Sequence, residues 1–378
     1  MSLAKPLHLP RAAPARVLAC GAFLKNTAGL LLGDRLWLSP PHGDLADPAA
    51  CRALEDSVQC LLTLAGHRID AVAHDLHPDF HGTRLAQRLA AELGVPAIAV
   101  QHHHAHIAVV QAELGLGDEP LVGLALDGVG LGHDGQAWGG EVLQLRGARC
   151  QRVAHLPQLA MPGGDIAARE PWRLAAAVLH ALGRGDEIVP RFGPRVGDRL
   201  AAGVAHMLAR GLQCPATTAA GRWFDAAAGV LRLSVRQQRE AEAARAVERR
   251  AADWLAQNPA PRPITEQLLP LLGQLFDRDP GEGAAQFHVA LSAWLVQAAQ
   301  QAAASAGASQ VVLAGGCFFN ALLSAQVRQG LQAAGLQVLR PASPALGCGD
   351  AGLPLGQAWA AALQLESARA VRAPALET

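Results

Sequence analysis

Short apolar runs and helical periodicity alternate along most of the chain. After an irregular lead-in at residues 1–14, three apolar runs separated by turn residues predict consecutive antiparallel strands at 16–20, 28–33 and 35–39. The pattern then predicts a helix at about 47–65, a strand at 69–75, a helix at about 83–92, a strand at 96–101 and a helix after His102. This order predicts a first α/β unit over residues 15–119.

A second unit with the same opening follows over residues 120–368. Strands are predicted at 121–128, 137–145 and 149–156, and the Ala-, Leu- and Arg-rich stretch at about 165–300 predicts a helical insertion. A strand at 308–316, a helix at about 319–334, a strand at 336–341 and a helix near 355–368 complete it. Two similar units in tandem predict an α/β protein of two actin-like lobes, the RNase H-like architecture called ASKHA.

Composition narrows the class of protein. The 32 basic and 32 acidic side chains balance, so no overall positive field favours nucleic acid as a partner. The seven cysteines form no C-x-x-C pair, which is typical of reduced thiols and excludes a zinc ribbon. Without a signal-like N-terminus or an 18-residue apolar run, the sequence predicts a cytoplasmic protein that has no membrane partner.

The densest chemical signal is QHHHAH at residues 101–106. His102 and His106 are four residues apart, so on a helix they share a face and can bind one metal ion together. Asp127 ends an apolar strand and Asp350 lies in GCGDAG, and both are candidates for further ligands. Such a mixed set of nitrogen and oxygen donors suits Fe, Zn or Mn. A His-rich surface turn and two turn aspartates are the alternatives.

Three glycine-rich segments are candidates for anion binding. DGVGLGHDGQAWGG at 127–140 lets backbone N–H groups approach an anion, and GGCFFN at 315–320 places a helix N-terminus after a strand. In MPGGDIAAREPWR, Arg169 is a candidate clamp for a phosphate or carbamoyl oxygen, although an ion pair at a helix start explains it equally well. Ordinary turns are the alternative for the first two segments. Cys317 has no general base nearby in sequence, which favours a packed thiol.

Several strings, in this order and spacing, closely resemble the C-terminal carbamoyltransferase domain of the HypF hydrogenase maturation family. They are GAFLKNT, HGDL, DLHPDFHGT, VQHHHAHIAVV, LALDGVGLGHDGQAWGGE, HLPQLAMPGGDIAAREPWR, GRWFDAAAGVL and GGCFFNALL. The resemblance covers residues from about 15 to 365. That domain is similar in fold to the tRNA threonylcarbamoyl transferase and to the nodulation and antibiotic O-carbamoyltransferases, all of which have two actin-like lobes.

The resemblance implies a reaction and a site. The domain passes a carbamoyl group from carbamoyl-adenylate, made with ATP, to the C-terminal cysteine thiolate of the partner HypE, whose thiocarbamate becomes cyanide ligands of the NiFe centre. It implies iron or zinc as the metal and His102, His106, Asp127 and Asp350 as its ligands. By analogy of position, Gly130 and Gly132 would approach the phosphate, and Gly315, Gly316 and Asn320 would meet the nucleoside. From the segment MPGGDIAAREPWR we add Gly164 and Asp165 as candidate cofactor contacts and Arg169 and Glu170 as candidate catalytic residues.

The sequence departs from the family pattern in two places. The family has Asn-Asp-Gly-Gly around the last ligand, whereas residues 349–352 are Gly-Asp-Ala-Gly, which puts nucleotide contacts from that loop in question. Full-length members also carry acylphosphatase, zinc-finger and adenylate-forming domains upstream, so we expect these functions to be supplied upstream or in trans. The alternatives are O-carbamoylation of a small hydroxylated molecule and a nucleotide-binding partner module without its own turnover.

Overall fold

The first lobe is built on a six-stranded sheet in the order β1-β4-β3-β2-β5-β6. The computed structural model describes residues 5–262, 267–343 and 346–372. In this lobe β2, β3 and β4 form an antiparallel meander, and β5 and β6 continue the sheet in parallel. The bounds are β1 Leu7–His8, β2 Val17–Ala19, β3 Gly29–Leu32, β4 Arg35–Leu38, α1 Pro48–Leu64, β5 Ala71–Asp75, α2 His81–Leu93, β6 Ala97–Val100 and α3 His102–Glu113. The sequence missed β1, because two residues are too few to show a period.

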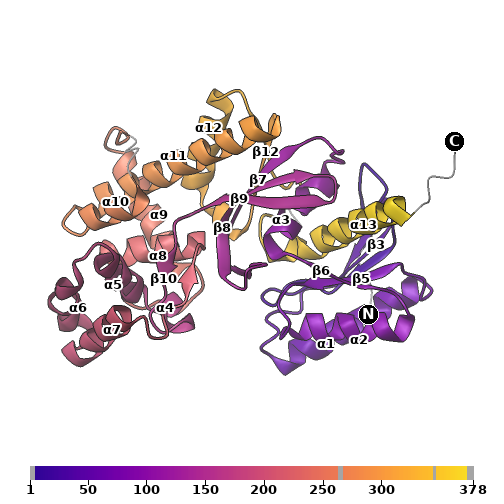
Figure 1. Cartoon of the computed structure of the whole chain (residues 1–378), viewed down its shortest axis with the longest axis horizontal. Helices are drawn as coiled ribbons and strands as arrows, with labels where there is room; N and C mark the ends of the chain where they lie inside the picture. Colours follow the sequence, from indigo (N-terminus) through magenta and orange to yellow (C-terminus); the bar gives the residue numbers. More distant parts are fainter. Residues whose placement is uncertain (1–4, 263–266, 344–345, 373–378) are drawn as a thin grey trace.

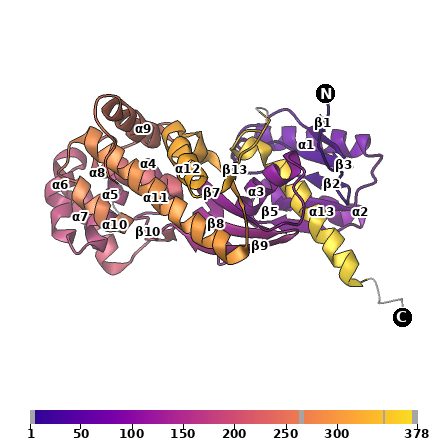
Figure 2. The same ribbon diagram turned by 90° about the horizontal axis from the view of Figure 1, so that it is seen from above.

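Helices cover both faces of this sheet. On one face, α1 and α2 bury their leucines against β2, β3 and β5. The other face is covered by α13 (Leu353–Arg372), whose Leu355 and Trp359 pack against Val17 and Leu31. Figures 1 and 2 both show α13 beside this sheet, although the order of elements along the chain groups it with the second lobe. The predicted boundary between the lobes, after residue 119, assigns α13 to the second lobe by its position in the chain. In the structure α13 packs against the sheet of the first lobe.

The second lobe has a seven-stranded sheet. Its main order is β10-β11-β8-β7-β12-β13, and β9 pairs with β8. The bounds are β7 Leu121–Leu131, β8 Ala137–Arg146, β9 Arg149–His155, β10 Leu159–Ala160, β11 Ala216–Thr217, β12 Gln310–Ala314, α12 Ala321–Ala333 and β13 Gln337–Leu339. The inward apolar side chains of β7, β8 and β12 alternate between α3 on one face and the helical insertion on the other.

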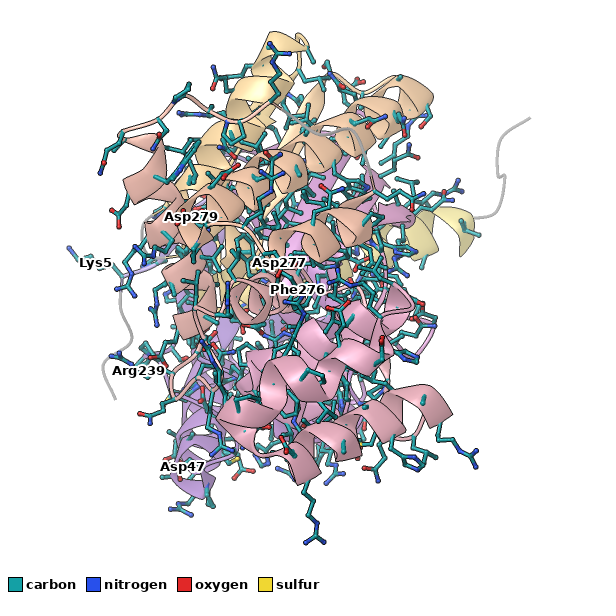
Figure 3. The ribbon with its side chains drawn as sticks, turned by 90° about the vertical axis from the view of Figure 1, so that its left-hand side faces the viewer. Lys5, Asp47, Arg239, Phe276, Asp277 and Asp279 are labelled. Carbon is teal, nitrogen blue, oxygen red and sulfur yellow. The ribbon has the colours of Figure 1, made fainter. Side chains whose placement is uncertain are left out.

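The helical insertion lies at the end of the molecule remote from the first lobe (Figures 1 and 3). Its helices are α4 Asp165–Arg169, α5 Pro171–Ala181, α6 Ile188–Val196, α7 Asp198–Arg210, α8 Ala220–Val230, α9 Glu242–Leu255, α10 Leu268–Leu275 and α11 Pro280–Ala306. The predicted insertion also contains the short strand β11, which joins the sheet beside β8. None of the described helices combines the length and apolar character needed to cross a bilayer.

Helix α3 lies between the two lobes and is buried on all sides from His102 to Ala112. It packs against β7 and β12 on one side and against α13 on the other. The backbones of α3 and α13 approach closely at Gly356, where an added Cβ atom would lie 1.9 Å from the carbonyl oxygen of Ala105. Because Ala105 lies between His102 and His106, the crossing of α13 fixes the position of the histidine-bearing turn.

We expect Gly356→Ala to lower the free energy of unfolding by about 1–3 kcal/mol, because the new methyl group has no room against the α3 backbone. The matched control is Gly203→Ala in α7, where an added Cβ atom meets nothing within 4 Å. That variant should gain up to about 1 kcal/mol from helix propensity. Chemical denaturation of both variants measures the difference, and a gain at both positions would contradict the close crossing.

Candidate metal centre and the adjoining cavity

The two histidines predicted to bind a metal lie on the first turns of α3. Gln101 caps the helix, and its Oε1 accepts a hydrogen bond from the backbone N–H of His104 at 3.0 Å. This cap begins the helix at His102, so that His102 and His106 are one turn apart and reach the same carboxylate of Asp127. Asp127 follows the buried part of β7, and Asp350 begins a single 3₁₀ turn that leads into α13.

The structure brings together all four residues that the sequence indicates as ligands. One donor atom from each of His102, His106, Asp127 and Asp350 lies within 4.8 Å of the others. Asp127 Oδ2 is 3.2 Å from His102 Nε2 and 2.9 Å from His106 Nε2, and Asp350 Oδ1 is 3.6 Å from His106 Nε2. Two imidazole nitrogens and two carboxylate oxygens fit Fe, Zn or Mn.

Protons compete with a cation for the nitrogen atoms of this cluster. Burial by itself lowers the pKa of both histidines, but hydrogen bonds to the carboxylates outweigh it and raise both pKa values, that of His102 well above 6.5. Burial likewise opposes ionisation of Asp127, yet the two histidines hold its pKa well below its usual range. Without a cation the protons therefore stay on the imidazole nitrogens and Asp127 stays ionised, so a divalent cation would have to displace protons from the two histidines on binding.

Asp75 supports His102 from the far side of the ring, a role the sequence analysis missed. Its Oδ2 is 2.9 Å from His102 Nδ1 and its Oδ1 accepts from the N–H of His77. Because a carboxylate only accepts, Nδ1 carries the hydrogen and Nε2 is directed at the cluster. A signal was present: Asp75 ends the strand that pairs in parallel with the one preceding His102, and the carboxyl ends of such strands share one edge.

We expect Asp75→Ala to weaken metal binding by about ten- to a hundredfold, because the His102 ring loses the partner that fixes its orientation. The matched control is Asp79→Ala four residues on, since the side chain of Asp79 is 72% exposed and pairs only with exposed Arg84 among the described residues. Competition with a chelator measures both affinities. Equal affinities in the two variants would show that Asp75 does not support the site.

A cavity of about 560 Å³ adjoins the cluster and is lined by both lobes and the insertion. Asp127 and Asp350 of the cluster line it, together with Gly316 and Asn320 of the predicted nucleotide segment. The sequence analysis did not assign a role to several charged residues that also line it: Lys25, Arg222, Asp225, Glu240, Arg245 and Glu248. These residues come from segments up to 223 positions apart, so no local pattern shows that they meet.

Asp225 is the buried carboxyl of this cavity. Arg222 Nη2 lies 2.8 Å from its Oδ2, and Gln237 Nε2 donates to its Oδ1 at 3.1 Å. Burial dominates and raises the pKa of Asp225 to about 6, although Arg222 and Gln237 act in the opposite direction. Nearby Cys317 also lines the cavity, and burial raises the pKa of its thiol far above neutral, so it is present as the uncharged thiol.

Gly130, Gly132 and Gly315 are not among the residues that line this cavity. An added Cβ atom at Gly130 would lie 2.7 Å from His103 Cε1, and one at Gly132 would lie 2.1 Å from Trp138 Nε1. At Gly315, where φ is +98°, it would lie 2.3 Å from the carbonyl oxygen of Leu126. Close packing therefore accounts for these three glycines, and their predicted ligand contacts remain predictions.

The segment 164–170 also lies outside the cavity lining. Gly164 and the exposed Asp165 begin the short helix α4, which ends at exposed Arg169. Glu170 is buried, its Oε2 accepts from Arg173 Nε at 2.6 Å, and its Oε1 accepts from Arg236. These contacts give Glu170 a structural role, while the ligand and catalytic roles predicted for this segment remain predictions.

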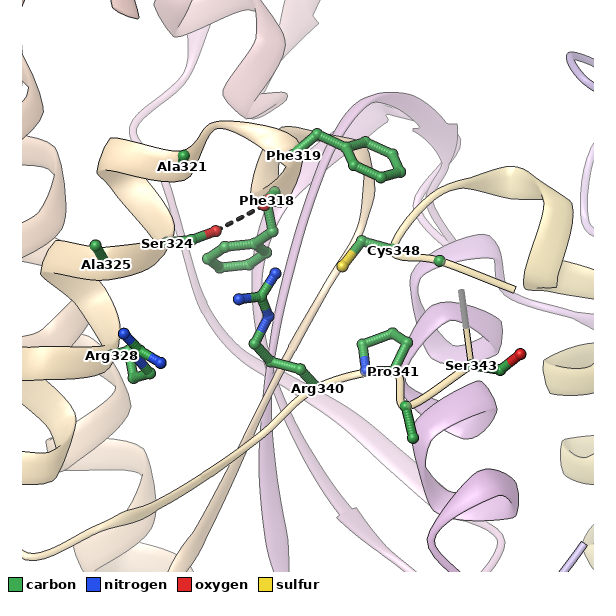
Figure 4. Close-up of a pocket in the computed structure, with 12 residues that line it drawn as sticks. Phe318, Phe319, Ala321, Ser324, Ala325, Arg328, Arg340, Pro341, Ser343 and Cys348 are labelled. Atoms are coloured by element: carbon green, nitrogen blue, oxygen red, sulfur yellow. Dashed lines mark hydrogen bonds between the residues drawn. The ribbon is translucent and has the colours of Figure 1, made fainter. Parts of the chain in front are cut away.

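A second cavity, of about 500 Å³, borders the first (Figure 4). Phe319 and Gly347 line both cavities, and the ring of Phe319 is 67% exposed. Figure 4 shows Arg328 and Arg340 on the walls of the second cavity, with Phe318 held through a 2.6 Å hydrogen bond from Ser324 Oγ to its carbonyl oxygen. None of His102, His106, Asp127 and Asp350 lines this second cavity, whereas Asp127 and Asp350 line the first.

Known proteins resemble this chain in sequence and in fold. Residues 12–113 match the family model described as the HypF Kae1-like domain, and residues 123–357 match the second subdomain of the carbamoyltransferase Kae1-like domain. A carbamoyltransferase HypF homologue of Cupriavidus necator is 55% identical over 94% of each chain. Carbamoyltransferase HypF2 of the same organism is 45% identical over 94% of this chain and 48% of its own length. The crystal structure of T. kodakarensis HypF superposes with a TM-score of 0.86 at 29% identity, covering 96% of this chain and 49% of that one.

These matches and the two-lobed architecture define a protein of the actin-like ASKHA class, as the order of elements predicted. Within that class the chain belongs to the HypF family of carbamoyltransferases. It spans nearly all of one C. necator relative and about half the length of the longer ones. A full-length HypF in a phosphate- and nucleotide-bound form superposes with a TM-score of 0.85 over 96% of this chain and 48% of that one, at 28% identity.

Proposed function

We propose that this chain is the carbamoyl-transfer module of NiFe hydrogenase maturation in the cytoplasm. It takes carbamoyl-adenylate and passes the carbamoyl group to the C-terminal cysteine thiolate of a HypE-like acceptor. A bond forms between the acceptor sulfur and the carbamoyl carbon, the bond from that carbon to the phosphate oxygen breaks, and AMP leaves with the electron pair. The observation that carries the proposal is the His102, His106, Asp127 and Asp350 cluster at the edge of the 560 Å³ cavity in a HypF-family chain.

The four cluster residues would hold one divalent ion, iron or zinc, and a bound ion of this kind supplies a Lewis acid for phosphate and carbonyl oxygens. The chain's own residues provide the remaining needs of the reaction. Asp75 fixes the ring of His102, and residues from both lobes enclose the cavity, which limits hydrolysis of a reactive mixed anhydride. The acceptor thiolate supplies the nucleophile, and Cys317 of the chain does not compete with it because burial keeps its thiol neutral.

Carbamoyl-adenylate has to be made before this step. The chain covers about half the length of several relatives, so we assign its synthesis to adenylate-forming and acylphosphatase modules that act upstream or in trans. The cavity of this chain then receives the finished adenylate.

The test is a reconstituted transfer reaction. The chain is incubated with a HypE-like protein, an adenylate-forming module, ATP and carbamoyl phosphate, and the acceptor is weighed by intact-mass spectrometry. We expect the acceptor to gain one carbamoyl group, and an acceptor without its terminal cysteine to gain none. An unchanged acceptor mass would overturn the proposal, and transfer to the cysteine-free acceptor would point to a hydroxyl group instead.

A further inference from the structure

Lys25 of the first lobe forms an ion pair with Glu240 of the second lobe at the 560 Å³ cavity. It lies between β2 and β3 of the first lobe, and its Nζ is 2.8 Å from Oε2 of Glu240, which precedes α9 of the insertion. Both residues line the cavity that contains Asp127 and Asp350. The two side chains are 57% and 64% exposed, so the ion pair adds little to stability and is easily exchanged for another partner.

Hydrogen bonds fix the backbone at Lys25, whereas its side chain is largely exposed. Lys25 has a φ of 48°, a left-handed conformation that is unusual for a lysine, and its N–H donates to Asp44 Oδ1 at 3.0 Å. The next residue, Asn26, donates from Nδ2 to the carbonyl oxygen of Cys20 at 2.9 Å, and His42 Nδ1 lies 2.7 Å from its Oδ1. The loop thus presents the ammonium group at a defined position in the cavity wall.

Lys25 differs from the other cations that line the cavity. Arg222 is paired with buried Asp225, and Arg245 donates to the carbonyl oxygen of Glu240 at 2.8 Å. Burial by itself lowers the pKa of Lys25, but Glu240, Asp350 and Asp127 outweigh it and raise that pKa. The ammonium group is therefore charged, it lines the same cavity as Asp127 and Asp350, and its ion-pair partner among the described residues is an exposed carboxylate.

We propose that Lys25 binds the phosphate of the nucleotide in this cavity, and that Glu240 competes with the phosphate for the ammonium group. The ligand class is a nucleoside monophosphate or an acyl-adenylate, and the inference rests on the proposed function. Binding exchanges the Lys25–Glu240 pair for a Lys25–phosphate pair, so the first lobe contacts the nucleotide through this side chain. Lys25 is thus a substrate-binding residue, and Glu240 limits affinity for the phosphate.

The test compares two variants that break the same ion pair. Binding of AMP and of adenosine to the whole chain is measured by calorimetry for Lys25→Met and Glu240→Gln. We expect Lys25→Met to weaken AMP binding about tenfold, as for loss of one charge-assisted hydrogen bond, and to leave adenosine binding unchanged. Glu240→Gln should strengthen AMP binding, because it removes the competitor. Lys25→Arg should retain most of the affinity for AMP.

Opposite changes in AMP affinity in the Lys25→Met and Glu240→Gln variants would exclude a purely structural role for the ion pair. If the pair only held the lobes together, both variants would change AMP affinity in the same direction, and adenosine would follow AMP; either result overturns the proposal. Thermal unfolding of each variant shows whether it is folded. If Lys25→Met does not fold, the test rests on Lys25→Arg and Glu240→Gln, and a loss of AMP affinity in Glu240→Gln overturns the proposal. Should the unaltered chain bind neither AMP nor adenosine, both this inference and the proposed function fail, whereas normal AMP binding by Lys25→Met overturns this inference alone.

Discussion

Replacing His102 or His106 by alanine is expected to remove the bound metal and to abolish carbamoyl transfer. Each ring supplies one of only two nitrogen donors in the cluster, and both rings contact the same Asp127 oxygen. The loss should exceed the roughly ten- to hundredfold effect of residues that only support a ligand, as expected for Asp75. Elemental analysis after dialysis gives the metal content, and the reconstituted reaction gives the transfer rate.

The matched control for these variants is His180→Ala, at the exposed end of α5 and outside the cluster. It should retain both metal and transfer. If His102→Ala and His106→Ala bind as much metal as the control does, the cluster is not the metal site. If they lose metal but transfer at the normal rate, the metal has no part in the reaction.

The strand and helix pattern of the fold could be predicted because its periodicity is local. Strands β2 to β9 and helices α1 to α3 lie within a few residues of the ranges that apolar spacing predicts. The surface against which a helix packs cannot be predicted from its own sequence. The face of α13 that carries Leu355 and Trp359 is apolar, but its sequence does not show that it covers the first sheet. The two-residue strands β1, β10 and β11 are too short for any period.

That the four candidate ligands lie together could be predicted for a related reason. His102 and His106 show their shared face within one turn, Asp127 follows the apolar part of a strand, and Asp350 lies among glycines. Lys25 and Glu240, in contrast, are 215 residues apart and meet only in the folded chain, where both line the same cavity. Gly130 and Gly132 show why a glycine-rich motif is ambiguous. A glycine needed for packing against His103 or Trp138 cannot be told apart in sequence from one needed for phosphate binding.

Glu170→Ala is expected to cost about 3–5 kcal/mol of unfolding free energy, because it leaves Arg173, whose side chain is 9% exposed, as a buried charge without its carboxylate. Arg236 and the indole of Trp172 lose the same partner. Metal content should not change, since Glu170 lies outside the cluster and the cavity lining. Chemical denaturation at pH 7 measures the loss, and the exposed pair Arg278–Glu282 provides the control, where Glu282→Ala should cost under about 1 kcal/mol.

The dependence on pH separates this structural role from a catalytic one. Burial by itself raises the pKa of Glu170, but Arg173 and Arg236 outweigh it and hold that pKa below its ordinary value. The carboxylate therefore contributes stability above its unfolded pKa of about 4.3, and the contribution is lost as the pH falls through the lower pKa of the folded state. The deficit of Glu170→Ala should accordingly be full at pH 7 and shrink in acid. A variant as stable as the unaltered chain at pH 7, but unable to transfer the carbamoyl group, would instead restore the catalytic role that the sequence predicts for Glu170.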